Sequence, residues 1–166
     1  NCNFSFTEQQ VINLVTAHGM VVVAAAGNGG YANCGGISNY VYPASYDNVI
    51  SVTAVAKWNN FVADPKRGLM TVYNDKVDLS AIGWDIYRQS YNGTNTCYTS
   101  VWTGTSHAAP MVAGAAGLIL SIEDGFSPAD VEDILKTSAF DISQCCGNRP
   151  YDGKIGAGRL DVYEAV

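Results

Sequence analysis

Residues 103–114, TGTSHAAPMVAG, place Ser106 between a Gly-Thr pair and a run of small residues that leads into an apolar segment. A serine hydroxyl is a weak nucleophile unless the fold supplies a base, a site for negative charge and a fixed direction of attack. If Ser106 begins a buried helix, unpaired N–H groups and the positive end of the helix dipole lie beside its hydroxyl. Pro110 cannot donate an N–H to the first turn, which suggests a helix start shaped for more than stability. An isolated Gly-Thr-Ser is an ordinary helix cap, so the context decides.

Asn28 is the second candidate group, because it directly follows the apolar run MVVVAAAG. An asparagine amide can donate an N–H to a developing alkoxide without adding a charge that would perturb a base. Between glycines, asparagine is more often a turn residue. Its place after a buried strand, with Gly-Thr-Ser further along the chain, favours the role of oxyanion donor.

Composition limits the class of protein. The chain is 48% hydrophobic and 14% charged, which indicates a globular fold, with residues 1–166 forming a single domain or a half-domain. The net charge is −6 and the nine Lys and Arg form no run, so nucleic acid is not an expected partner. The uninterrupted apolar runs, such as residues 108–113, are too short to predict a membrane span. The first residue is Asn1 and not Met, so we expect a processed or excised segment.

The cysteines indicate disulfides and a secreted or extracytoplasmic location. The chain has no C-x-x-C and no metal-binding spacing of cysteine and histidine. The sequons at Asn3 and Asn92 are compatible with secretion. We expect at least one disulfide that uses Cys34 or Cys97. The adjacent pair should reach different partners because a bridge between neighbours is strained, and the odd count leaves one thiol over. The five cysteines are Cys2, Cys34, Cys97, Cys145 and Cys146.

Hydrophobic periodicity predicts an α/β order. The first helix begins with Thr7 as N-cap, carries Val11, Leu14 and His18 on one face, and stops at Gly19. A helix over residues 105–122 is apolar on all sides, as expected of a central helix against a sheet. The other expected elements are strands within 20–28, 48–56 and 77–83, a helix over 127–139 with Ser127 as N-cap and Pro128 at the first position, and irregular binding loops over 29–43 and 58–76.

Four blocks, in order along the chain, resemble the subtilisin-like serine peptidases (subtilases). They are GMVVVAAAGNGG, YPASYDNVISVTAV, VDLSAIG and GTSHAAPMVAGAAGLIL, and the final GAGRLDVYEAV stands where the family has its closing Gly-x-Gly and helix. The resemblance implies an α/β fold in three layers, with a parallel sheet covered by helices on both faces and incomplete at its N-terminal side. It also implies that residues 1–166 are the C-terminal half of the catalytic domain of a serine endopeptidase, which hydrolyses polypeptide substrates through an acyl-enzyme.

The resemblance implies roles for particular residues. Ser106 would be the nucleophile, with the Asn28 side chain and the Ser106 backbone N–H as oxyanion donors. No cofactor is implied, and structural calcium is common in the family, but no carboxylate cluster here has a spacing to which a site can be assigned. The substrate-binding residues would be Ala24, Ala25, Ala26 and Gly27 as one wall of the primary specificity pocket, and Tyr42, Pro43 and Ala44 near its floor.

One departure from the family is large. The family's Asp-Thr-Gly and His-Gly-Thr blocks are absent from this sequence. His107 adjoins Ser106 on the predicted helix and points about 100° away from it, so it cannot serve as the base. His18 ends the first helix, where a structural role is usual. Met111 and His107 also exchange the His and Met usual at these positions. We therefore expect a complementary upstream half that carries Asp and His, and no turnover by this segment alone.

Two other functions remain open. Residues 27–32 contain a G-x-G-x-x-A after an apolar strand, which is a dinucleotide-binding pattern, but a loop of Gly, Asn and Pro follows where that pattern needs a helix. The other alternative is a catalytically inactive subtilase-like binding or structural module. Labelling by a fluorophosphonate probe separates an active peptidase from such a module.

Overall fold

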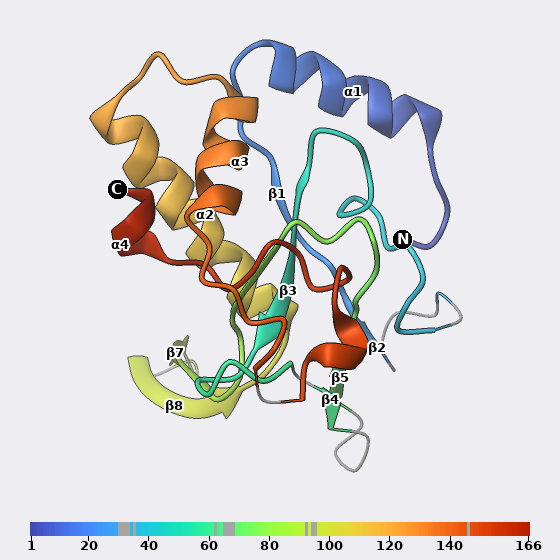
Figure 1. The fold of residues 1–166 in the computed structure, drawn as a ribbon, viewed down its shortest axis with the longest axis vertical. Coiled ribbons are helices and arrows are strands. Elements are labelled where there is room, and N and C mark those ends of the chain that lie inside the picture. Colours follow the sequence, from blue (N-terminus) through green and yellow to red (C-terminus); the bar gives the residue numbers. More distant parts are fainter. Residues whose placement is uncertain are drawn as a thin grey trace.

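A three-stranded parallel sheet forms the centre of the chain (Figure 1). The computed structural model describes residues 1–29, 34, 36–61, 63–64, 69–91, 93, 96–145 and 147–166. The strands stand in the order β1-β3-β6, with β1 at Val23–Ala25, β3 at Ile50–Val55 and β6 at Leu79–Ile82. Both strand pairs are parallel, as the continuous apolar run before Asn28 predicts for the first of these strands.

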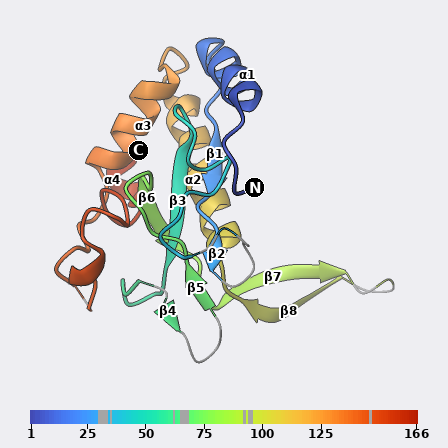
Figure 2. The ribbon, with the colours of Figure 1, turned by 90° about the vertical axis from the view of Figure 1, so that its right-hand side faces the viewer.

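Helices lie on both sides of this sheet, so the predicted α/β class is confirmed. Helix α2, Thr105–Ile122, packs against all three strands and runs behind the sheet in Figure 2, and α1, Phe6–Ala17, lies at the upper end of the sheet, nearer the viewer. Helix α3, Pro128–Thr137, and the short α4, Val162–Ala165, pack beside α2. The bounds of α2 are those that the apolar run predicts.

The alternation of side chains along β3 explains the two-sided packing. Ile50, Val52 and Ala54 join the core that β6, α2 and α3 share. On the opposite face, the Thr53 hydroxyl donates to the carbonyl oxygen of Val72 at 2.6 Å. All six residues of β3 are buried, which is expected for the middle strand of a covered parallel sheet.

The start of α1 differs from the prediction. Ser5, not Thr7, is the N-cap, and its hydroxyl accepts from the Glu8 N–H at 3.4 Å. Both serine and threonine are good caps, and the Tyr46 hydroxyl holds the earlier start, because it accepts from the Ser5 N–H at 2.9 Å and donates to Glu8 at 2.6 Å. The apolar face predicted for α1 is also exposed: Leu14 is 59% exposed, and Gln9 is the buried residue of the helix.

The end of the first apolar run also differs from the prediction. The parallel strand stops at Ala25, and Asn28–Gly29 form a separate strand, β2. This strand pairs antiparallel with β5, Leu69–Thr71, which in turn pairs with β4, Ala63–Asp64. The stretch 58–76, expected to be irregular, therefore contributes two short strands.

A hairpin of β7, Ile86–Tyr91, and β8, Thr96–Trp102, projects away from the sheet (Figure 2). The sequence patterns do not predict it. One turn of 3-10 helix, Arg149–Tyr151, precedes the C-terminal segment. The capping box of α3, with the Ser127 hydroxyl accepting from the Asp130 N–H and Pro128 in the first turn, is confirmed.

The expected disulfide is present between Cys2 and Cys34, with a sequence separation of 32. It joins the segment before α1 to the segment after β2. The Cys97 side chain, Cys146 and the sequon asparagine Asn92 lie outside what the structure describes, so the predictions for them stay open.

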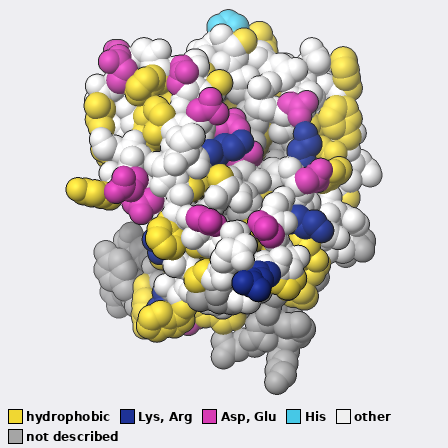
Figure 3. All heavy atoms as spheres, in the orientation of Figure 1, with side chains coloured by type: hydrophobic (Ala, Val, Ile, Leu, Met, Phe, Trp, Pro, Cys, Tyr) yellow, Lys and Arg dark blue, Asp and Glu magenta, His cyan; other side chains and the backbone are white. Residues whose placement is uncertain are grey.

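Helix α2 is long and apolar enough to cross a membrane, by length and composition alone. In this structure, residues along one side of α2 are buried in the main core against the sheet and α3. Among the described residues, acidic and basic side chains are interspersed on the face shown in Figure 3, without a continuous basic patch. This distribution gives no support for a nucleic-acid surface on that face.

Candidate functional site

Ser106 lies in the first turn of α2, at the carboxyl-end edge of the parallel sheet. Gly104 is the N-cap, and its N–H donates to the carbonyl oxygen of Gly83, just after β6, at 2.8 Å. The Ser106 side chain is exposed, whereas its neighbour Thr105 is fully buried. The helix start is therefore anchored through Gly104 and Thr105, which leaves Ser106 facing solvent.

Asn28 and Thr105 connect the strand region of β1 and β2 to the same helix start. The Thr105 N–H donates to Asn28 Oδ1 at 3.0 Å, and the Gly27 N–H donates to Thr105 Oγ1 at 3.1 Å. Because a backbone N–H can only donate, the contact fixes which end of the Asn28 amide is oxygen. The Asn28 Nδ2 group is consequently the end left to donate beside Ser106.

The close approach at the helix start requires glycine at two positions. A Cβ built on Gly83 lies 2.7 Å from the Gly104 carbonyl oxygen and 2.7 Å from Ala54 Cβ, which no real side chain tolerates. A Cβ on Gly104 lies 3.2 Å from both Asn28 Oδ1 and Nδ2, and its φ of 156° also favours glycine. Gly83 and Thr105 are the positioning residues that the sequence patterns did not reveal.

Neither histidine is placed to act as a base. The His18 ring Nδ1 bonds to the carbonyl oxygen of Leu14 at 2.7 Å, at the end of α1. His107 follows Ser106 on the helix and makes no hydrogen bond to it. Over the described residues, the Ser106 hydroxyl has no hydrogen-bond partner of any kind. Within this chain, neither histidine is therefore paired with the Ser106 hydroxyl.

The residues predicted for the specificity pocket fall into two places. Ala24, Ala25, Ala26 and Gly27 lead directly from β1 to Asn28, and Gly27, with φ of 112°, packs between Val41 and Val72. Tyr42 and Pro43, joined by a cis peptide bond, line a hollow with residues of α1, and Ala44 is buried beside them. The Tyr42 ring packs on Tyr46, with ring centroids 4.6 Å apart. Their assignment to a substrate pocket stays a prediction.

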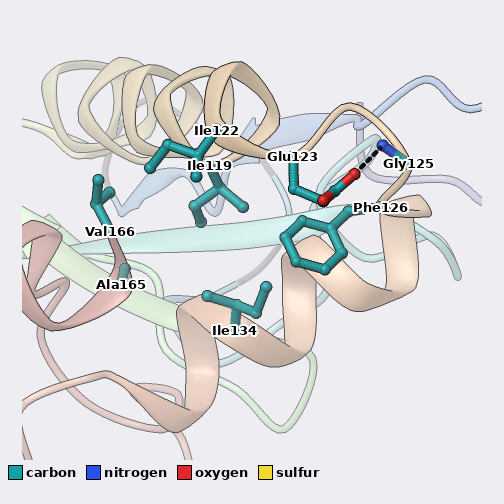
Figure 4. A pocket seen from close by; sticks show the side chains of 8 residues that line it. All are labelled: Ile119, Ile122, Glu123, Gly125, Phe126, Ile134, Ala165 and Val166. Atoms are coloured by element: carbon teal, nitrogen blue, oxygen red, sulfur yellow. Dashed lines mark hydrogen bonds between the residues drawn. The ribbon is translucent and has the colours of Figure 1, made fainter.

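A separate hollow lies at the opposite end of α2 (Figure 4). Glu123 Oε1 accepts from the Gly125 N–H at 3.3 Å at its rim. With a rise of about 1.5 Å per residue, the C-terminal end of α2 is about 24 Å from Ser106, too far to take part in chemistry there. The side chains that line the hollow are those of Ile119, Ile122, Glu123, Phe126, Ile134, Ala165 and Val166.

The residues described here contain no group of three or more His, Cys, Asp or Glu side chains that could hold a metal ion. The dinucleotide pattern also lacks its structural context. Gly29 lies in β2, which pairs antiparallel with β5, and residues 34 and 36–49 contain no helix. A helix N-terminus for a pyrophosphate is therefore not found in the part of this loop that the structure describes.

The fold and site define an α/β protein in which an exposed serine begins a core helix and a fixed asparagine amide lies beside it. Comparison with known proteins agrees: the model of the subtilase family matches residues 3–158, and the chain belongs to that family.

Curated relatives and solved structures resemble the chain over most of its length. It is 38% identical over 158 residues to subtilisin DY of Bacillus licheniformis, covering 95% of this chain and 51% of that protein. It is 36% identical over 148 residues to halolysin of Haloferax mediterranei, covering 88% of this chain and 24% of that protein. The structure of a protease from Pseudoalteromonas arctica aligns with a TM-score of 0.72 at 28% identity, covering 99% of this chain and 47% of that one. The chain thus spans about half or less of the length of these relatives.

Proposed function

We propose that the chain is the nucleophile-bearing part of a serine endopeptidase domain, and that a polypeptide outside these 166 residues supplies the histidine and aspartate. The observation that carries the proposal is the bond from the Thr105 N–H to Asn28 Oδ1. It fixes a neutral side-chain donor beside the exposed serine at the start of a core helix. Family membership supports the peptidase class in general.

In the proposed reaction, Ser106 Oγ attacks the carbonyl carbon of the scissile peptide bond while its proton passes to the supplied histidine. Negative charge then develops on the carbonyl oxygen, where Asn28 Nδ2 and the Ser106 backbone N–H would donate. No described residue accepts from that backbone N–H, as expected in the first turn of a helix. Collapse of the intermediate expels the amine, and water releases the acyl group from Ser106.

The exposed side of α2 supports the idea of a complementary polypeptide. Pro110, Ala113 and Gly117 follow Ser106 at helical spacing and are all exposed, and Leu118 beside them is 49% exposed. An element that packs along this apolar stripe would have one end beside Ser106. Within the described residues, β1 is also an edge strand that pairs only with β3, so a further strand can be added there.

The remaining parts of the proposal concern substrate and location. Ala24 to Gly27 would form one wall for the substrate residue on the acyl side, with Tyr42 to Ala44 near its floor. The substrate is a polypeptide and no cofactor takes part. We also propose a secreted or extracytoplasmic location, which the Cys2–Cys34 disulfide supports because reducing compartments disfavour such bonds.

A fluorophosphonate probe tests the proposal directly. Two samples are treated with the probe: the chain by itself, and the chain mixed with the polypeptide that carries the Asp-Thr-Gly and His-Gly-Thr blocks. Hydrolysis of a chromogenic peptide by the same two samples is followed in parallel. We expect labelling and turnover only in the mixture, and neither in Ser106→Ala. Turnover by the chain alone would contradict the two-part site. Assembly without labelling would favour the inactive module.

A further inference from the structure

The segment before α1 carries a modification motif that the proposed reaction does not use. Asn3-Phe4-Ser5 has the pattern Asn-x-Ser, in which x is any residue except proline. Secretory pathways attach oligosaccharides to the asparagine of this pattern where it lies at the surface of a protein. Because such triplets also arise by chance, the structure around Asn3 decides whether the motif can be used.

The side chain of Asn3 is open to an approaching enzyme. Asn3 is exposed and lies outside the helix, because Ser5, with an extended backbone, is the N-cap of α1. Among the described residues, no group forms a hydrogen bond with the side-chain amide of Asn3, whose backbone N–H lies 3.5 Å from Asn1 Oδ1. The N-terminus lies on the side of the molecule away from α3 and α4 (Figure 1). The Asn3 Nδ2 atom is therefore accessible in the folded chain.

Ser5, the third residue of the motif, keeps its hydroxyl proton available. Its Oγ atom accepts from the Glu8 N–H at 3.4 Å, and its backbone N–H donates to the Tyr46 hydroxyl at 2.9 Å. A hydroxyl that accepts a hydrogen bond still has one proton to donate. Within the described part of the chain, nothing accepts that proton. The serine thus anchors the segment and leaves the motif complete.

The residue beside Asn3 gives an independent indication of the compartment. Cys2 forms the disulfide with Cys34, and Asn1 exchanges two main-chain hydrogen bonds with Tyr42, at 3.0 and 2.8 Å. Disulfides form in oxidising compartments such as the lumen of the secretory pathway, which is also where asparagine-linked oligosaccharides are attached. The covalent bond and the motif therefore point to the same environment.

A hollow beside Asn3 offers space and polar partners to a first sugar. Asn3, Phe4, Ser38, Tyr40 and Asp75 are among the residues that line it. The Tyr40 hydroxyl donates to Asp75 Oδ1 at 2.9 Å, whereas Asp75 Oδ2 and the Ser38 hydroxyl have no hydrogen-bond partner among the described residues. Phe4 is 55% exposed. Sugar hydroxyls bond to such polar atoms and sugar C–H groups pack on aromatic rings, so an attached sugar fits this surface.

We infer that Asn3 accepts an asparagine-linked oligosaccharide when the chain passes through a secretory pathway. The donor is an oligosaccharide carried on a polyprenyl pyrophosphate. Asn3 Nδ2 forms a bond to the anomeric carbon while the bond from that carbon to the pyrophosphate oxygen breaks. The amide loses one proton to solvent, and the lipid pyrophosphate leaves with the electron pair. The inference rests on the proposed extracytoplasmic location and not on the peptidase reaction, to whose residues Asn3 makes no hydrogen bond.

The test is secretion of the chain from insect cells. An amidase then releases the oligosaccharides in heavy-oxygen water, which converts each modified asparagine to labelled aspartate. Peptide mapping by mass spectrometry should find the label at Asn3, separately from the second motif at Asn92. Culture with an inhibitor of lipid-linked oligosaccharide synthesis should remove it. Ser5→Asp should also abolish the label, because it removes the hydroxyl but keeps a good helix cap, whereas Ser5→Thr should retain it.

Asn1→Gln is the matched control, because Asn1 is also exposed, lies two residues away and is outside the motif. The label at Asn3 should be unchanged in this variant. An unlabelled Asn3 in the secreted chain, or a label that persists in Ser5→Asp, would overturn the inference. Since the host imposes the secretory compartment, either result leaves the proposed location untouched. That location is refuted instead if the protein is found in the cytoplasm of its source with Cys2 and Cys34 reduced.

Discussion

Two substitutions at Asn28 separate its proposed catalytic role from its structural one. Asn28→Asp keeps an oxygen that can accept from the Thr105 N–H, but it has no amide group to donate. Asn28→Ala loses both the accepting oxygen and the donating amide group. Thr105 is fully buried, so its N–H would be left unsatisfied in the alanine variant. That loss costs about 1–3 kcal/mol of unfolding free energy, whereas aspartate near a helix N-terminus costs little.

Both variants should lower kcat in the assembled enzyme. Removing one oxyanion donor costs about 10²–10³ in kcat, a magnitude measured on a subtilisin and transferred here to its relative. KM should change little, because the bond is made mainly in the transition state. The aspartate variant should lose at least as much kcat, since its carboxylate repels the developing oxyanion. We therefore expect normal stability with low activity for Asn28→Asp, and loss of both for Asn28→Ala.

Stability is measured by urea denaturation and kcat with a chromogenic peptide, with the exposed Asn3→Ala as control. A normal kcat in Asn28→Asp would refute the amide as oxyanion donor. A normal stability in Asn28→Ala would refute the argument that the bond to Thr105 anchors the helix start.

Three further changes test the supporting structure. Gly83→Ala should lower the unfolding free energy by about 1–3 kcal/mol and reduce kcat more than it raises KM, because its Cβ would lie 2.7 Å from the Gly104 carbonyl oxygen; urea denaturation and steady-state kinetics measure the two effects. Cys2→Ser should cost about 2–4 kcal/mol through the lost disulfide, as denaturation under non-reducing conditions would show. Hydrogen bonds from Ser127 hold the pKa of the Asp130 carboxyl below its usual 3.8. These bonds therefore stabilise the folded state above pH 3.8, and this stabilisation is lost as the pH falls through the pKa of Asp130 in the folded state. Ser127→Ala should therefore lower the melting temperature at pH 6, by a difference that shrinks toward pH 2, and an equal difference at both pH values would contradict this linkage.

The elements with a strong local signal were predictable. Helix α2 and strands β3 and β6 are mostly apolar and contain no charged residue, and the capping box of α3 involves residues three apart. The start of α1 was not predictable, because two cap patterns overlap in residues 5–10. A distant residue decides between them: the Tyr46 hydroxyl accepts from the Ser5 N–H and donates to Glu8.

The candidate site also combines residues that the sequence predicts with contacts that it does not predict. Its serine and asparagine were apparent from their motifs, but the contact that joins them involves Asn28 and Thr105, which are 77 residues apart in sequence. No local pattern shows that Gly83 must lack a side chain, because the reason is the approach of Gly104 after the hairpin. The hairpin itself has mixed polar and aromatic residues in both strands, so it lacks the alternation that marks a half-buried strand.

The start of α2 is hydrogen-bonded to residues that follow the two outer strands of the sheet. Thr105 is bonded to Gly27 and Asn28 after β1, and Gly104 is bonded to Gly83 after β6. These two contacts fix the helix end from within the chain, so Ser106 needs no partner of its own to be held in position. That leaves its outer side open, and the apolar stripe that continues from it along α2 remains exposed as well. A polypeptide that covers the stripe gains free energy from burying apolar surface, and the same association brings its groups next to Ser106. Assembly and completion of the catalytic site would thus be one event, with the nucleophile already in place before the base arrives.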